Sequence, residues 1–213
     1  MESALLQRLQ DKTMTKEELL QKVKEELNLL PEILNGVNSS KPAIRYGCAN
    51  VLMDLSGEYP ENLYPYMDSF IKLLSSNHRI LVWNSIIIIA NLAKVDKCKK
   101  FDAVFDQYFC LLDDGYMVTV ANIVGHSSKI ALAKPYLIQR ITNELLRVEN
   151  ISTTNHLTDE CKRVIAEKTI KTLGMFFEKI DDKKRVISFV ARQIHSPRKA
   201  LRVQAQDFLS KFS

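Results

Sequence analysis

Two kinds of helical segment alternate along the chain, and the spacing of apolar residues makes both visible. Apolar side chains three and four positions apart, as from Leu63 to Leu74 and from Phe101 to Leu112, indicate amphipathic helices rather than strands. A short polar turn follows each of these helices, and then a second helical segment begins at an apolar anchor residue. Four positions after the anchor stands a small residue, and eight positions after it stands an aliphatic residue or glycine. Steps of four and eight lie on one helical face, where small residues let neighbouring helices approach closely.

The second segments recur at a nearly constant spacing. Their anchors are Ile44, Leu81, Met117, Ile165 and Leu201, which lie 37, 36, 48 and 36 residues apart. A unit of this length is typical of stacked helix pairs, because one pair cannot bury its own apolar face. The sequence therefore predicts an all-α solenoid of about five helix pairs.

The predicted units fill one repeat domain, residues 1–213. The pairs cover approximately residues 16–58, 61–96, 98–132, 135–180 and 182–213, with a polar insertion at 149–160. The insertion is interpreted as an elongated turn, with Thr158 capping the helix that follows. Thr15 to Glu18 has the pattern of a capping box, and Pro31 is expected to bend or break the first leading helix.

The amino-acid composition mainly argues against certain fold classes and sites. Only six Gly and six Pro disfavour a turn-rich β fold. Four cysteines without a CxxC pair predict free thiols and a reducing, cytoplasmic location, with no metal site and no cofactor. The densest apolar run, 86–90, is far shorter than the roughly 20 residues that cross a bilayer.

The repeated phrases resemble a known family. Ile44-Arg45 followed by Cys48-Ala49 and Leu52 is similar to the second-helix pattern of HEAT repeats, as is Leu201-Arg202 followed by Ala205. Residues 89–93 (Ile-Ala-Asn-Leu-Ala) are similar to the end of an armadillo third helix. The resemblance covers roughly residues 17–213 and implies a right-handed α-α superhelix whose second helices line a concave face.

That resemblance also implies a binding face, at positions two, three, six and ten after each anchor. The predicted partner-binding residues are Tyr46, Asn50, Asp54, Trp83, Asn84, Ile87, Asn91, Ile123, Lys168 and Lys171. Tyr46 and Trp83 occupy equivalent places and can form an aromatic ridge, with asparagine amides beside it to pair with a peptide backbone. The alternative, that both aromatics pack between repeats as core, is equally compatible with the pattern.

The predicted function is a non-catalytic scaffold that binds a protein or peptide, because no catalytic motif is present. Residues 161–213 hold 13 Lys and Arg against 5 Asp and Glu, while residues 1–160 hold 17 against 20, so an acidic partner suits the C-terminal part. The alternative is nucleic-acid binding, with alkylpurine DNA glycosylases as a HEAT-like precedent. Its phosphate-binding residues would include Lys162, Arg163, Lys183, Lys184, Arg185, Arg198, Lys199 and Arg202.

Overall fold

Helices follow one another through residues 3–212, the part of the chain that this computed structural model describes. Within that range the only β pairing is an isolated antiparallel bridge between Thr154 and Leu157. The all-α prediction is therefore confirmed.

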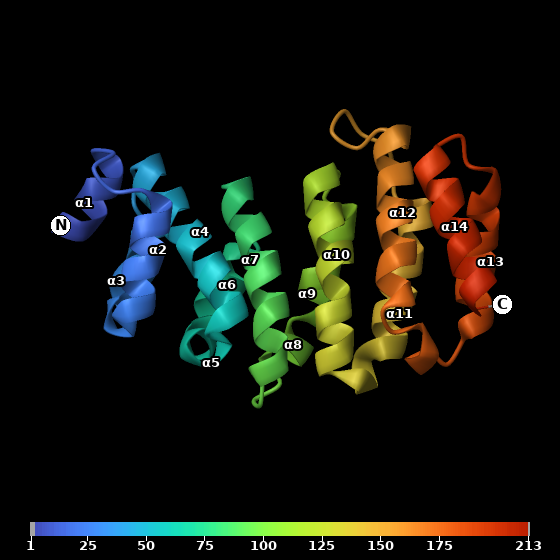
Figure 1. The fold of residues 1–213 in the computed structure, drawn as a ribbon, viewed down its shortest axis with the longest axis horizontal. Helices are drawn as coiled ribbons and strands as arrows, with labels where there is room; N and C mark the ends of the chain where they lie inside the picture. Colours follow the sequence, from blue (N-terminus) through green and yellow to red (C-terminus); the bar gives the residue numbers. More distant parts are fainter. Residues whose placement is uncertain (1–2, 213) are drawn as a thin grey trace. The chain divides into compact units, whose positions relative to one another are not determined.

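The chain forms two compact units, Met1–Phe101 (unit 1) and Asp102–Ser213 (unit 2), and Figure 1 shows the order of their helices. Unit 1 contains α1 (Ala4–Gln10), α2 (Lys16–Glu25), α3 (Leu30–Gly36), α4 (Pro42–Glu58), α5 (Pro60–Leu63), α6 (Met67–Leu73) and α7 (Arg79–Leu92). The boundary falls within α8 (Lys100–Ala103). Unit 2 contains α9 (Phe105–Phe109), α10 (Met117–Ala133), α11 (Ile138–Leu146), α12 (Asp159–Gly174), α13 (Lys183–Ala191) and α14 (Lys199–Phe212).

Short 3-10 helices extend or join many of these helices. They are η1 (Leu27–Leu29), η2 (Tyr64–Tyr66), η3 (Ala93–Val95), η4 (Cys110–Asp113), η5 (Pro135–Leu137), η6 (Arg147–Asn150), η7 (Phe177–Lys179) and η8 (Arg192–His195).

Local sequence signals set several helix ends as predicted. The Thr15 hydroxyl accepts from the Glu18 amide while the Glu18 carboxylate accepts from the Thr15 amide, which completes the capping box. The first leading helix is broken just before Pro31, because α2 ends at Glu25, η1 intervenes and α3 begins with Pro31 in its first turn. Thr158 accepts from the Cys161 amide and caps α12.

The core of unit 1 lies around α4 and α7, which pack directly against each other. The predicted four-residue steps are buried on both helices, at Ile44, Cys48 and Leu52 of α4 and at the equivalent positions of α7. Each fully buried aliphatic side chain stabilises the fold by roughly 1.5–3 kcal/mol. Helix α7 is apolar almost all round because α4, α5 and α6 cover it.

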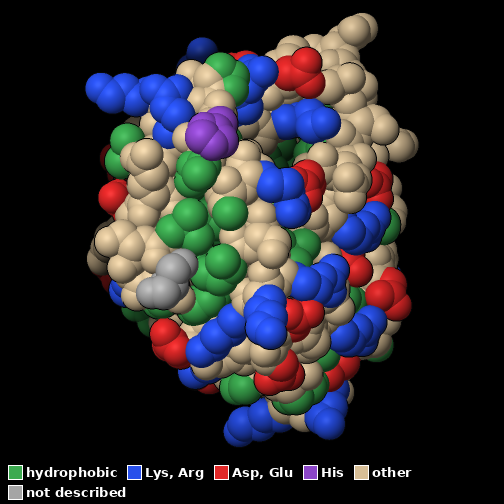
Figure 2. All heavy atoms as spheres, turned by 90° about the vertical axis from the view of Figure 1, so that its right-hand side faces the viewer, with side chains coloured by type: hydrophobic (Ala, Val, Ile, Leu, Met, Phe, Trp, Pro, Cys, Tyr) green, Lys and Arg blue, Asp and Glu red, His purple; other side chains and the backbone are tan. Residues whose placement is uncertain are grey.

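In unit 2, helices α10, α12 and α14 pack side by side (Figure 1). Helix α11 packs against both α10 and α12, and helix α13 packs against α14. The rings of Phe177, Phe208 and Phe212 form a cluster with centroids 4.6–5.1 Å apart. Figure 2 shows the end of this unit, formed by α13 and α14, where a band of hydrophobic side chains is bordered by many charged ones.

The insertion is more ordered than a solvated turn. Its Ile151 and Leu157 are buried, and the Thr154 hydroxyl donates to the Gly115 carbonyl over 2.6 Å. The His156 ring stacks on Tyr116 with centroids 4.3 Å apart, next to the start of α10. Residues 151–158 are thus a packed part of unit 2.

Polar contacts join successive repeats at the repeat distance. In unit 1 Lys24 pairs with Glu58 and Lys100 with Asp68, 34 and 32 residues apart. In unit 2 Lys134 pairs with Asp102, Arg140 with Asp106 and Arg147 with Asp113, 32, 34 and 34 residues apart. Across the insertion the separation grows to 43, between Arg192 and Glu149. The same positions of neighbouring helix pairs therefore lie next to each other within each unit.

Candidate binding faces on the second helices

The burial pattern fixes which residues of the second helices can meet a partner. On α4, counted from Ile44, the positions 0, 4, 5, 7, 8, 11 and 12 are buried. On α12 the same offsets from Ile165 are buried, the last two being Phe176 and Phe177 just beyond the helix. The half-buried and exposed positions at offsets 2, 3, 6 and 10 of these two helices form what we call the ladder face.

The predicted register of α10 is wrong by two residues. Of the seven offsets buried on α4, six are buried on α10 when the anchor is Thr119, but only two when it is Met117. Thr119 is fully buried, and its hydroxyl donates to Asp114 over 2.7 Å, so a polar residue occupies the place where the sequence pattern requires an apolar one. Ile123 is then a core residue with no exposed surface and cannot contact a partner. The ladder face of α10 is Ala121, Asn122, Gly125 and Lys129.

In unit 1 the ladder face combines aromatic and amide side chains. Tyr46, Trp83 and Ile87 are half-buried, neither sealed in the core nor fully exposed. Arg45 lies over the Tyr46 ring at 4.7 Å from its centroid, and His78 meets the ring edge-on at 6.2 Å. The aromatic side chains are therefore partly packed against neighbours and partly exposed to solvent. This arrangement lies between the exposed aromatic ridge and the buried core position that the sequence pattern allows.

The three predicted asparagines have different roles. The Asn84 amide, which is only 7% exposed, donates to Oδ1 of half-buried Asn50 over 2.9 Å and links α7 to α4 just beneath the ladder face. Asn91 is 8% exposed and donates to the buried Ser56 hydroxyl over 2.8 Å, so its amide joins α7 to α4 inside the unit. Asp54 pairs with Lys16 over 3.1 Å.

In unit 2 the predicted Lys168 and Lys171 lie on the ladder face of α12. Lys168 is half-buried, and its burial together with the charge of Lys171 lowers the pKa of its ammonium group. Burial, with the charges of Lys129 and Lys168, lowers the pKa of His126 to about 4. Lysines from α10 and α12 thus share one surface, a grouping that the shifted register of α10 hides in the sequence.

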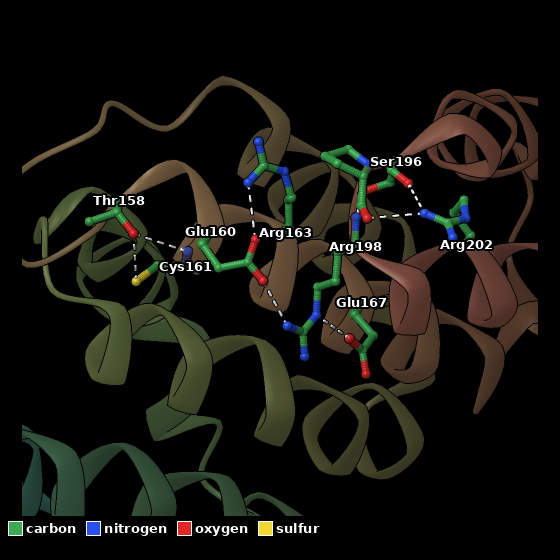
Figure 3. Close-up of polar contacts among 9 residues, drawn as sticks. Thr158, Glu160, Cys161, Arg163, Glu167, Ser196, Arg198 and Arg202 are labelled. Atoms are coloured by element: carbon green, nitrogen blue, oxygen red, sulfur yellow. Dashed lines mark hydrogen bonds and ion pairs between the residues drawn. The ribbon is translucent and has the colours of Figure 1, made fainter.

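The arginines of the alternative phosphate-binding set are mostly engaged (Figure 3). Arg198 bridges Glu167 and Glu160 over 2.9 and 2.7 Å, and Arg163 pairs with the same Glu160 over 3.0 Å. Arg202 donates to the carbonyls of Ser196 and Pro197. The guanidinium groups of these arginines are therefore already bonded to carboxylates and backbone carbonyls of the same protein.

The rest of that set lies around α12, α13 and the start of α14. Lys183 pairs with Glu178 over 2.7 Å, and Arg185 donates to Asn143 over 2.8 Å. Lys162 is half-buried, whereas Lys184 and Lys199 are exposed. Only these three of the set have no ion pair or side-chain hydrogen bond within residues 3–212.

A repeated structural arginine went unrecognised in the sequence, although the motif shows it. Arg45 donates to the Ser39 carbonyl over 3.0 Å, and Arg202 donates to the Ser196 carbonyl over 2.7 Å. Both arginines stand one residue after their anchors and hold the turn between paired helices. This role explains the Ile-Arg and Leu-Arg phrases without invoking a ligand.

Among residues 3–212 no group of three His, Cys, Asp or Glu side chains is placed to hold a metal ion. None of the helices formed by these residues is long and apolar enough to cross a membrane.

Taken together, the stacked helix pairs and their repeat-spaced contacts define an α-solenoid. No protein-family model matches the sequence, and no curated protein matches it either. Among solved structures the chain is similar to "Designed armadillo repeat protein YIII(Dq)4CqI", at 18% identity and a TM-score of 0.65 over 100% of this chain and 93% of that one.

Two further structures agree. "Designed armadillo repeat protein YIII(Dq.V1)4CPAF in complex with peptide (KR)4" matches at 16% identity and a TM-score of 0.64, over 98% of this chain and 91% of that one. "Computationally designed armadillo repeat proteins for modular peptide recognition" match at 17% identity and 0.64, over 98% and 92%. The fold is therefore that of an armadillo- or HEAT-like α-solenoid, as the sequence predicted.

Proposed function

We propose that this chain is a non-catalytic binding protein that recognises an extended peptide segment of a partner on the ladder face of unit 1. The observation that carries the proposal is half-buried Asn50, which the buried Asn84 amide holds in place, beside half-buried Tyr46 and Trp83. Asn50 accepts one bond from Asn84 and retains its own amide donors and further acceptor capacity for a peptide backbone. Aromatic side chains next to such groups are the usual anchors of protein interfaces.

The neighbouring structures support this choice of ligand. One of the designed armadillo proteins is in complex with the peptide (KR)4, and others were designed for peptide recognition. In this chain Asp54 lies on the same face as Asn50, so unit 1 offers one carboxylate that is held by Lys16 until a basic partner residue competes for it.

The non-catalytic part of the proposal rests on the same surfaces. The polar groups of the ladder face of unit 1 are amides, a phenol and one ion-paired carboxylate, which suit recognition rather than proton transfer. The four cysteines are free, which suits a reducing compartment such as the cytoplasm. Nucleic-acid binding is a weaker second candidate because the arginines that would contact phosphates are already bound to protein groups.

The test is a selection from a random peptide library displayed on phage, with the whole chain as bait. We expect enriched peptides whose affinity falls about tenfold for Trp83→Ala, because about 1.4 kcal/mol of aromatic contact is lost. Tyr136→Ala is the matched control, since Tyr136 is 58% exposed but lies on η5, outside the second helices. Failure to enrich any peptide, or equal binding by the Trp83→Ala variant, contradicts the proposal.

A further inference from the structure

Gly125 lets a lysine of the next helix lie across α10. A methyl group at Gly125 would come within 2.3 Å of Lys168 Cε and 2.7 Å of Lys168 Nζ. The Lys168 side chain therefore occupies the space that any larger residue at position 125 would fill. The missing side chain at Gly125 thus leaves room for the ammonium group of Lys168 to lie over α10.

The charges around Lys168 are of one sign. Lys171 lies one helical turn further along α12, and Lys129 and Lys168 both act on His126 of α10. Neither Lys168 nor Lys171 has a carboxylate partner within residues 3–212, and buried Nδ1 of His126 has no hydrogen-bond partner there. Like charges held close together repel, and an anion placed between them removes that repulsion.

Neither Glu167 nor Asp207 forms an ion pair with Lys168 or Lys171 within residues 3–212. Glu167 of α12 is engaged by Arg198 of α14 over 2.9 Å. On α14, Asp207 and Lys211 both line the groove beside Lys171, and Lys211 lies over the Phe212 ring at 4.9 Å from its centroid. The surface of α12 beside α10 and α14 thus keeps positive charge from Lys168 and Lys171.

A groove with an apolar floor adjoins the lysines. It lies between α12 and α14, has a volume of about 400 Å³, and has Lys171 and Lys211 among its lining residues. Met175, which is 53% exposed, and the rings of Phe208 and Phe212 supply apolar lining. Met175 stands four residues after Lys171, so the lysines and the groove share one face of α12.

We propose that the α10–α12–α14 face of unit 2 binds an acidic peptide segment, whose carboxylates pair with Lys168 and Lys171 while one of its apolar side chains enters the groove beside Met175. The inference rests on the proposed function, because it takes the ladder faces as peptide-binding surfaces. A protein segment fits better than a nucleic acid, since the groove beside the lysines is lined by methionine and phenylalanine. A polynucleotide would need a longer row of unpaired cations along its backbone.

The test uses the whole chain and a fluorescein-labelled peptide of four Glu-Glu-Leu repeats, followed by fluorescence anisotropy. We expect saturable binding that is weakened about tenfold when Leu is replaced by Ser, and more when Glu is replaced by Lys. The double variant Lys168→Glu/Lys171→Glu should lower the affinity at least about tenfold. Lys184→Glu/Lys199→Glu is the matched control, because it changes the net charge equally at exposed positions outside the ladder face.

Three outcomes overturn the inference. They are no binding of the Glu-Glu-Leu peptide, equal loss in the Lys184/Lys199 control, or tighter binding of a single-stranded oligonucleotide that the Lys168/Lys171 variant also loses. Circular dichroism of each variant shows whether the fold is intact. If library-selected peptides still bind through Trp83 while the acidic peptide fails, only this inference falls and the proposed function stands.

Discussion

The two units share a buried register but differ in what they expose. Six of the seven offsets that are buried on α4, counted from Ile44, are also buried on α10, counted from Thr119. On the ladder face, unit 1 presents Tyr46, Trp83 and Asn50, whereas unit 2 presents glycine and lysines. The comparison teaches that repeat packing constrains the core positions, while the remaining positions are free to diverge toward different ligands.

The largest predicted difference between the units concerns two equivalent ion pairs. Lys134 is 4% exposed and binds Asp102 over 2.8 Å, whereas Lys100 and Asp68 are 27% and 66% exposed. Lys134→Ala should destabilise the protein by about 3 kcal/mol because it strands a partly buried carboxylate. Lys100→Ala should cost less than about 1 kcal/mol, because water screens the exposed pair. Urea denaturation followed by circular dichroism measures both, and equal losses would show that burial does not separate the pairs.

Two glycines provide the next contrast. A methyl group at Gly36 would lie 2.4 Å from the buried sulfur of Cys48, so Gly36→Ala should destabilise unit 1 by about 2 kcal/mol. At Gly125 the obstacle is the flexible end of Lys168, which can move aside. Gly125→Ala should then stabilise the helix by roughly 0.5–1 kcal/mol. The same urea experiment applies, and destabilisation by Gly125→Ala would mean that Lys168 cannot leave its place.

Acid should weaken unit 2 through His126. The folded protein lowers the pKa of His126 from about 6.5 to about 4, so between these pH values the unfolded chain binds more protons than the folded one. The contribution of His126 to stability is complete above pH 6.5 and is lost as the pH falls toward 4, by about 1–2 kcal/mol after allowance for solvent screening. His126→Gln should remove this part of the pH dependence of urea stability. His78→Gln, in unit 1, is the control, and an unchanged profile in the His126→Gln variant would refute the assignment.

The smallest predicted losses of stability come from the two turn arginines, and they should be equal in the two units. Arg45→Ala and Arg202→Ala each release a turn carbonyl, at a cost of about 1 kcal/mol. Arg45 also supports the Tyr46 ring, so only Arg45→Ala should also weaken binding of a library-selected peptide. Thermal unfolding and anisotropy together separate the two roles. A loss of peptide affinity with Arg202→Ala would show that the effect is not local to Tyr46.

Periodicity was sufficient to predict the helices and the repeat, because burial in a solenoid follows the helical period closely. It failed at Thr119, where a buried hydroxyl finds its partner in Asp114, so residue polarity does not report burial there. That two-residue error placed Ile123 on the binding face and hid the position of Lys129, which acts on His126 together with Lys168.

Single-residue roles were harder to predict than helices. Asn84 and Asn91 are both buried amides on one helix, yet Asn84 bonds half-buried Asn50 and Asn91 bonds buried Ser56. The distinction depends on which neighbour the packing of α4 supplies, and sequence spacing does not contain that information. Likewise, the net charge of residues 161–213 predicts a basic surface, but only ion-pair geometry shows which cations are already engaged.

The central claim is that the ladder face of unit 1 is where a peptide binds, and Trp83, the one tryptophan of the chain, reports on it directly. The decisive measurement is acrylamide quenching of its fluorescence during titration with a library-selected peptide. We predict that quenching falls and the emission shifts to the blue as the peptide saturates the protein. Unchanged quenching at full saturation would contradict the claim, because the peptide would then occupy another surface.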